Sequence, residues 1–300
     1  MSLYTQQSKN IHKTWLLMGL FFIVVIAIGW LFSQVYGNPG FVYIAVIFSL
    51  FMNFFSYWYS DKVALAMAGA RPIQREENLE LYRIVENLCI TAGLKVPKIY
   101  IINDPSPNAF ATGRNQEHAA MAVTSGLLEM MNKNELEGVI AHELSHVGNK
   151  DILISTVVVV LVGFIALLSD FFLRMQFFRG GRRSDREEGQ GQAIMMLIGV
   201  ALAILAPIAA TLIQLAISRK REFLADTDGA LLTRYPEGLA SALVKISQYP
   251  TPLRRVNKAT AHLYIDSPLK GKHGASWLAK LFMTHPPVEE RIMALRGMNV

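Results

Sequence analysis

Residues 142–146 read His142-Glu143-Leu144-Ser145-His146, and this HExxH stretch determines how the rest of the chain is interpreted. If the stretch is helical, the two imidazoles lie four residues apart, on one face and one turn from each other. Two neutral imidazoles at this spacing can bind one Zn²⁺, and the glutamate between them can act as general base on a water at the metal. The alternative is a surface helix with two solvated histidines, so the surrounding sequence has to decide.

Four long apolar stretches dominate the remainder of the chain: residues 14–35, 41–60, 152–173 and 193–217. The first, second and fourth contain no charged residue, and the third contains only Asp170. They explain why hydrophobic residues make up 52% of the chain and charged residues only 17%. Each stretch reaches the ~20 residues that a helix needs to cross a bilayer core, which predicts four transmembrane helices. Buried helices of a soluble core are the alternative.

The first two apolar stretches are expected to form a membrane hairpin. The first is too long for a cleaved signal peptide and is followed at once by the second, which predicts a retained anchor. The turn Gly37-Asn38-Pro39-Gly40 joins them and leaves both ends of the hairpin on one side. Basic residues flank the hairpin on that side: Lys9, Lys13, Lys62, Arg71 and Arg75. The positive-inside rule places these flanks in the cytoplasm, and with them residues 61–151.

The linker between the third and fourth stretches, residues 174–192, is rich in Gly and Arg and is expected to be a flexible loop. It holds more arginines than acidic residues, which opposes the positive-inside trend if both flanking stretches span. We still expect four spans, because a two-span chain would have to bury both stretches elsewhere.

The net charge of +6 does not predict a nucleic-acid partner. Basic residues beside membrane segments account for it, and no stacking aromatics are interleaved with a basic groove. The single cysteine, Cys89, excludes an internal disulfide and a cysteine-based zinc site. Any metal must therefore be held by histidines and carboxylates.

The segments outside the apolar stretches predict an α+β, mostly helical fold. Apolar residues three and four apart predict helices over residues 76–92, 133–150, 237–249, 277–283 and 288–298, and Ser125-Gly126 opens a short one. Strands are expected over residues 98–102, 108–110 and 118–124. The expected parts are an N-terminal hairpin over 1–60, a catalytic part over 61–151, a second hairpin over 152–217 and a second catalytic part over 218–300.

A third metal ligand is expected after the second hairpin, where the chain returns to the membrane face of His142. Glu222 and Asp226 are four apart there, on one helical face. One carboxylate can bind zinc, and the other can accept a hydrogen bond from a ligating imidazole. The alternative is an acidic pair on a solvated helix. The extended metzincin pattern is excluded, because Asn149 and Ile152 occupy the positions that it requires to be glycine and histidine.

The motifs HELSHVGNKD over 142–151 and SRKREFLAD over 218–226, with the apolar hairpins, resemble the HtpX-type membrane zinc metalloproteases. That family is related to the CAAX prenyl endoproteases. Two further segments support the resemblance: SPNAFATG over 106–113, and THPP over 284–287 with Glu290-Arg291 following. The resemblance implies four transmembrane helices with a cytoplasmic zincin-like domain in a prokaryotic plasma (inner) membrane.

The resemblance also implies roles for individual residues. His142, His146 and Glu222 would bind one Zn²⁺, Glu143 would be the catalytic base, and Asp226 would support a ligating histidine. His285 is a candidate donor to the oxyanion, and Arg291 a candidate to hold His285, the oxyanion or the substrate. These last two assignments compete with a purely structural role.

Substrates are expected to be polypeptides. Asn108 is a candidate contact to the substrate backbone, and the strand around 117–123 a candidate edge for strand addition. The resemblance favours an endopeptidase that removes misfolded or damaged membrane proteins as part of quality control and the stress response. A CAAX-type processing protease and a scaffold or transporter with a vestigial site are the alternatives.

Overall fold

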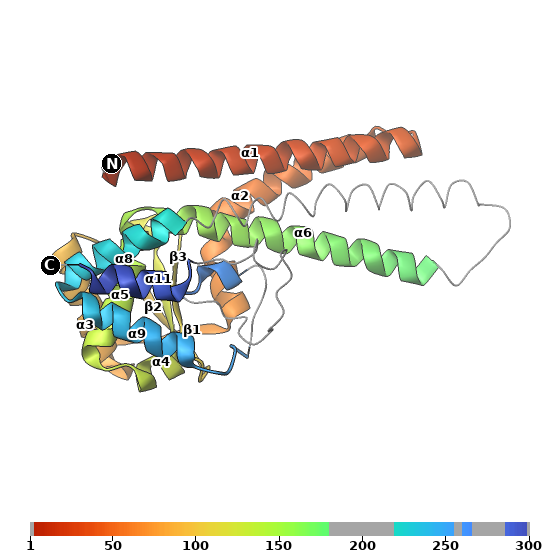
Figure 1. Cartoon of the computed structure of the whole chain (residues 1–300). Coiled ribbons are helices and arrows are strands. Elements are labelled where there is room, and N and C mark those ends of the chain that lie inside the picture. The colour runs from red at the N-terminus through yellow and green to blue at the C-terminus, as the bar shows by residue number, and fades with distance from the viewer. Residues whose placement is uncertain (1–2, 180–218, 255–259, 266–285, 299–300) are drawn as a thin grey trace.

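The computed structural model describes residues 3–179, 219–254, 260–265 and 286–298. These residues form a mostly helical structure with one small sheet. Three long helices extend in the same direction from a globular part (Figure 1). The prediction of a mostly helical α+β fold is confirmed for this part of the chain. The boundaries expected between the membrane and catalytic parts stay predictions.

The first two long helices form the expected hairpin. α1 (Leu3–Tyr36) and α2 (Gly40–Ala68) are uncharged and apolar over most of their length, and their windows Gln7–Tyr36 and Gly40–Ala68 are long and apolar enough to cross a membrane. Both ends of the hairpin lie at the globular part (Figure 1). Trp15 of α1 stacks on Tyr57 of α2 at 5.9 Å, near that end. Tryptophan and tyrosine prefer the interface of a bilayer, so this pair is typical of a membrane boundary.

The third long helix, α6 (Asp151–Arg179), packs against the hairpin through an apolar cluster that includes Phe21, Met52 and Val158. Its part Asp151–Leu167 is long and apolar enough to cross a membrane only together with α5 (Lys133–Gly148), and the two helices are bent by 84°. The described chain therefore has two clear candidate spans. α6 continues to Arg179, so the first residues of the predicted loop 174–192 are helical; the fourth apolar stretch lies outside the described residues.

The sheet has four strands in the order β1-β2-β4-β3. The strands are β1 (Ala70–Pro72), β2 (Lys98–Ile102), β3 (Ala109–Thr112) and β4 (Ala120–Thr124). β2 and β4 are parallel, with Tyr100 beside Ala122, and the two outer strands are antiparallel to their neighbours. The three strands predicted from the sequence are confirmed. The prediction that residues 117–123 offer a free edge is wrong, because β4 is paired with β2 on one side and with β3 on the other, and the outer strands are β1 and β3.

Shorter helices make up the rest of the globular part. α3 (Leu79–Ala92), α8 (Arg219–Thr233) and α9 (Pro236–Gln248) pack on α5, α4 (Ser125–Met130) packs on β4, and α11 (Val288–Arg296) packs on α8 and α9. Short 3₁₀ turns cover Arg75–Glu77, Gln116–His118 and Ala261–Leu263. Their apolar faces form one core with α5, built from residues such as Leu81, Val139, Leu144 and Leu243. The predicted helices are confirmed, except that 277–283 lies outside the described residues.

Candidate metal centre

α5 carries the HExxH stretch and lies buried among the other helices. Its start is set by Asn132, whose side chain accepts from the Glu135 backbone N–H, while the Glu135 carboxylate accepts from the Asn132 N–H. This reciprocal pair is a capping box, which satisfies helix donors that would otherwise lack partners. The helical periodicity then places His142 and His146 one turn apart on the same face, as the sequence predicts.

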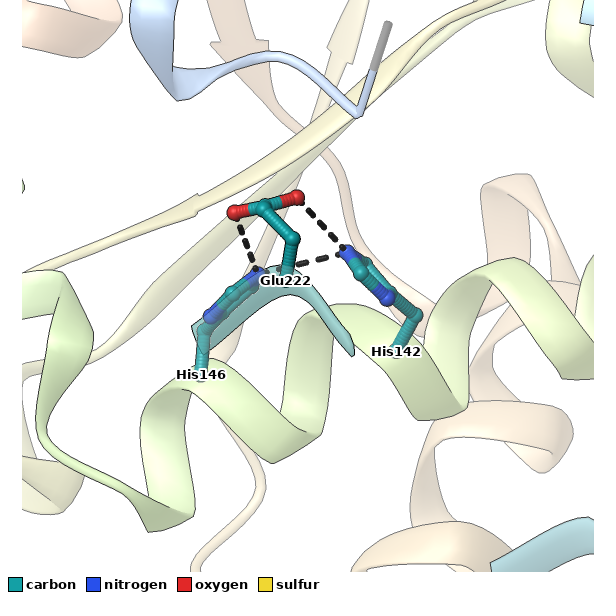
Figure 2. A group of neighbouring side chains, drawn as sticks. All are labelled: His142, His146 and Glu222. Carbon is teal, nitrogen blue, oxygen red and sulfur yellow. Dashed lines mark hydrogen bonds and ion pairs between the residues drawn. The ribbon is translucent and has the colours of Figure 1, made fainter. Parts of the chain in front are cut away.

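Glu222 of α8 completes a cluster with the two histidines (Figure 2). His142 Nε2 and His146 Nε2 lie 3.2 Å apart. Glu222 Oε2 is 3.8 Å from His142 Nε2, and Glu222 Oε1 is 3.7 Å from His146 Nε2. Ligands of a tetrahedral zinc ion at 2.0–2.1 Å stand roughly 3.3 Å from one another, so the three side chains fit one zinc ion. The third ligand proposed from the sequence is thus brought to the two imidazoles.

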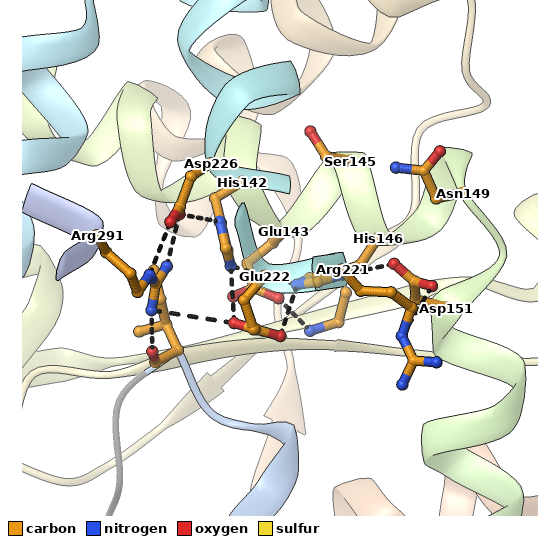
Figure 3. A network of polar contacts seen from close by, with 12 residues as sticks. His142, Glu143, Ser145, His146, Asn149, Asp151, Arg221, Glu222, Asp226 and Arg291 are labelled. Atoms are coloured by element: carbon orange, nitrogen blue, oxygen red, sulfur yellow. Dashed lines mark hydrogen bonds and ion pairs between the residues drawn. The ribbon is translucent and has the colours of Figure 1, made fainter. Parts of the chain in front are cut away.

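Each imidazole turns its other nitrogen toward a carboxylate (Figure 3). His142 Nδ1 lies 2.9 Å from Asp226 Oδ1, and His146 Nδ1 lies 3.0 Å from Asp151 Oδ2. A carboxylate on Nδ1 favours the tautomer that leaves Nε2 free to bind a metal, and it holds the ring in place. Both Nε2 atoms are therefore presented to the same point.

Asp226 is itself held by Arg291 of α11, which is only 1% exposed. Arg291 donates from Nε to Asp226 Oδ2 at 2.8 Å and from Nη2 to Oδ1 at 2.7 Å, and from Nη1 to the carbonyl of Ile265 at 2.9 Å. Burial raises the pKa of the Asp226 carboxyl, but the guanidinium and the His142 contact outweigh it and lower the pKa to about 2. Asp226 is thus ionised at neutral pH and faces His142 as an acceptor.

Glu143 lies on the side of α5 that faces β3. Its Oε2 accepts a hydrogen bond from the backbone N–H of Ala111 at 2.8 Å, and the side chain is buried. Burial raises the pKa of this carboxyl above its usual value. A buried carboxylate with a raised pKa is suited to accept and return a proton near neutral pH.

His146 is influenced by opposing effects. Burial lowers its pKa, but the hydrogen bond with Asp151 and the carboxylates of Glu222, Asp151 and Glu143 outweigh burial and raise the pKa to about 9. A metal ion must displace this proton from the ring before it can bind.

The remaining predicted site residues take different places. Asn108 is buried where β3 begins; its backbone N–H donates to Thr124 Oγ1 at 2.9 Å, and its side-chain oxygen accepts from the Ala109 N–H. Arg291 contacts Asp226, and its Nη1 also lies 3.9 Å from Glu222 Oε2. A substrate contact by either residue stays a prediction. His285 lies outside the described residues.

Sequence reasoning missed Asp151, which entered it only as the last residue of the motif HELSHVGNKD. Lys150 adopts a left-handed φ of 57°, and this turn between α5 and α6 brings Asp151 back over His146. Arg221 Nε is 3.3 Å from Asp151 Oδ1. His262 was also not singled out; it lines the pocket that contains His142, His146 and Glu222. A carboxylate five residues after the second histidine was the available signal, but its position depends on the turn.

Comparison with known proteins places these observations in a family. Residues 75–299 match the description "Peptidase family M48". The chain belongs to this family. A "Protease HtpX homolog" of Caldanaerobacter subterraneus subsp. tengcongensis is 46% identical over 303 residues, which cover 100% of this chain and 99% of the relative. A protein of the same description from Pyrococcus furiosus is 48% identical over 286 residues, 95% of this chain and 94% of the relative.

A solved structure shares the fold. The crystal structure of S. mikatae Ste24p aligns with a TM-score of 0.50 and 16% identity, over 98% of this chain and 66% of that chain. The M48 match and the HtpX relatives confirm the resemblance drawn from the motifs. The chain is a membrane-embedded metalloprotease, and the cluster of His142, His146 and Glu222 is its candidate metal site.

Proposed function

We propose that this M48 protein is a zinc-dependent endopeptidase that cuts misfolded or damaged membrane proteins on the cytoplasmic side of a prokaryotic plasma membrane. The observation that carries the chemistry is the convergence of His142 Nε2, His146 Nε2 and the Glu222 carboxylate, with all ligand atoms within 4.8 Å of one another. The three come from two helices that are far apart in the sequence, which a chance HExxH pattern would not explain.

The donor set favours zinc. Two imidazoles and one carboxylate are a ligand set that catalytic zinc sites use, with one further position for water or substrate. Zinc, when bound, polarises a substrate carbonyl and makes water more acidic. Histidine ligands held by carboxylates through Nδ1 are typical of such sites, and both imidazoles have this arrangement.

Glu143 is proposed as the base. Its carboxylate is anchored by the Ala111 N–H, so its free oxygen has a fixed direction relative to β3. It would accept a proton from water and pass it to the leaving amine of the peptide. The raised pKa that burial gives this carboxyl suits both transfers. His285 is kept as a proposed donor to the oxyanion.

The substrate backbone is proposed to lie along β3, with Asn108 near the start of that strand. β3 is one of the two outer strands of the sheet among the described residues. The Ala109 carbonyl on it accepts from the Ile265 N–H at 3.1 Å, and the Ala111 N–H donates to Glu143 Oε2 at 2.8 Å. An extended peptide would add to this edge by taking over main-chain contacts such as that of Ile265, and main-chain hydrogen bonds recognise any sequence. A sequence-independent contact suits a protease for unfolded substrates.

The side of the membrane is proposed from charge. Both ends of the α1–α2 hairpin lie at the globular part, and Lys9, Lys13, Lys62 and Arg71 lie at those ends. Excess Lys and Arg near membrane segments mark the cytoplasmic side. Four spans remain part of the proposal, with α6 and the stretch 193–217 as the second pair.

The decisive experiment compares the full-length, detergent-purified protein with Glu143→Gln on casein-like unfolded substrates, with and without a chelator. The expected result is chelator-sensitive cleavage by the parent and a loss of several orders of magnitude in the variant at unchanged zinc content, because the ligands remain. Cleavage by the variant at the parental rate would reject Glu143 as the base. A prenylated CAAX peptide cut in preference to unfolded protein would favour the processing alternative.

A further inference from the structure

The first membrane helix reaches the metal centre. Near the start of α1, Gln7 Nε2 donates to the carbonyl of Gly148 at 2.7 Å. One turn further, Asn10 Nδ2 donates to the carbonyl of Asn149 at 3.2 Å and to Asp151 Oδ1 at 2.6 Å. Asn10 is 1% exposed, so these contacts are made away from water. α1 therefore contacts the turn that directly follows the HExxH stretch.

Asp151 connects this contact to the metal cluster. Its Oδ1 accepts from Asn10, and its Oδ2 faces His146 Nδ1 at 3.0 Å. Arg221 is a second partner of the same carboxylate, at the longer distance of 3.3 Å from Oδ1. A carboxylate with one oxygen held by a short hydrogen bond can rotate little, so it keeps its other oxygen directed at the ring. Asn10, Asp151 and His146 thus form one chain of polar contacts, although Asn10 and Asp151 are 141 residues apart in sequence.

We infer that Asn10 is a positioning residue of the metal centre: it fixes Asp151, and Asp151 fixes the ring and tautomer of His146. The inference rests on the proposed metal site, because it concerns how tightly that site binds zinc. Its consequence is that the docking of α1 against the globular part sets the metal affinity. The membrane anchor is then a structural part of the site rather than a tether.

The chemistry of the amide explains why asparagine suits this position. The NH₂ group supplies two donors, which match the two acceptors that face it, the Asn149 carbonyl and the Asp151 carboxylate. Aspartate has nearly the same shape but would place a second carboxylate against Asp151. A role in packing alone would tolerate Asn10→Asp better than Asn10→Ala, whereas a positioning role predicts the reverse order.

The test measures the zinc affinity of the full chain in detergent, by competition with a chromophoric chelator. The variants are Asn10→Ala, Asn10→Asp, Asp151→Asn and the double variant Asn10→Ala/Asp151→Asn. Thr14→Val is the matched control, because Thr14 is equally buried one turn along α1, and within the described residues its hydroxyl bonds only to the carbonyl of Asn10 in its own helix. Loading with Co²⁺ gives a second readout, since its visible absorption reports the geometry of the ligands.

Asn10→Ala is expected to weaken zinc binding about 10-fold, the lower end of what loss of a supporting partner costs. Asn10→Asp is expected to weaken it at least as much, and Thr14→Val to leave it unchanged. In the Asp151→Asn background, removing Asn10 is expected to add little, because the two act through one contact. The Co²⁺ spectrum should change in the Asn10 variants and not in the control.

Three outcomes would overturn the inference, and they are distinguishable. If the parent binds zinc tightly and Asn10→Ala and Asn10→Asp bind it equally well, the positioning role is wrong while the proposed metal site stands. If the parent binds no zinc, or if Glu222→Ala and the parent bind it alike, the proposed site itself fails and the inference fails with it. If Asn10→Ala and Asp151→Asn each weaken zinc binding and the two losses add fully in the double variant, Asn10 does not act through Asp151.

Discussion

Arg291 and Asp226 form a buried bidentate ion pair, with Nε to Oδ2 at 2.8 Å and Nη2 to Oδ1 at 2.7 Å. The pair joins α11, near the end of the chain, to α8, which also carries Glu222. Because Asp226 Oδ1 also lies 2.9 Å from His142 Nδ1, the C-terminal helix contributes to the orientation of a candidate zinc ligand. Substituting Arg291 therefore tests whether the candidate metal site depends on residues that do not themselves bind the metal.

Arg291→Leu is expected to destabilise the protein by about 3–5 kcal/mol, because it leaves the Asp226 carboxylate buried without its partner. Arg291→Lys should recover only part of this, since an ammonium cannot make the two parallel hydrogen bonds. Thermal unfolding in detergent would measure both.

The control for Arg291 is Arg296→Leu, on the same helix. Arg296 pairs with Glu237 at 2.9 Å, but both side chains are largely exposed, at 53% and 42%. Exposed ion pairs are screened by water and contribute little to stability, so this change should be nearly neutral. Equal effects of the two leucine substitutions would contradict a special role for the buried pair.

Glu222→Gln is expected to lower zinc occupancy strongly while the fold persists, because an amide oxygen is a poor replacement for an anionic zinc ligand. Metal analysis of the purified variant, with Glu289→Gln as an exposed control, would measure this. Full occupancy in Glu222→Gln would exclude Glu222 as a ligand.

Zinc affinity is expected to rise as pH increases from about 6.5 to about 9, because the raised pKa of His146 lets a proton compete with the metal in this range. The stability of the metal-free fold is expected to change with pH in the opposite direction. A group with a raised folded pKa stabilises the fold below its unfolded pKa, so the chelator-treated protein should lose stability as pH rises through the same range. Measuring zinc affinity as a function of pH would check the first expectation. Measuring the melting temperature of the chelator-treated protein as a function of pH would check the second.

Asp151→Asn provides the control for this pH dependence. It removes a contact that raises the pKa of His146, so both pH-dependent changes should move to lower pH. A pH profile unchanged in Asp151→Asn would show that another group titrates.

Gly229→Ala is expected to weaken zinc binding by separating α8 from α5. A methyl group at Gly229 would meet the backbone N of His142 at 3.0 Å and its Cα at 3.2 Å. Backbone atoms cannot move aside cheaply, so the helix that carries Glu222 must shift by a few tenths of an ångström. Alanine otherwise favours a helix by up to about 1 kcal/mol over glycine, which makes a loss informative.

Gly19→Ala is the matched control on α1, where nothing lies within 4 Å of the added methyl group. It should leave zinc affinity and melting temperature unchanged or slightly raise the latter. If Gly229→Ala behaved in the same way, close contact between the two helices would not be required for the site.

Local features of the chain were predictable because they depend on residues a few positions apart. Helical periodicity places His142 and His146 on one face, and the Asn132–Glu135 pair starts the helix that holds them. Apolar length similarly marks the α1–α2 hairpin. Glu222 and Asp226 were recognised as a pair by their spacing, and their assignment to zinc and to support followed the family resemblance.

Contacts between distant segments were decided only by the tertiary structure. Asp151 reaches His146 because Lys150 turns the backbone sharply, and Asn10 reaches Asp151 because α1 docks beside that turn. Arg291 turned out to hold Asp226, and β4 proved to be an inner strand. No periodicity encodes such contacts, since they depend on how whole helices and strands pack. The sequence by itself determined which side chains can bind a metal; packing determined which others hold them in place.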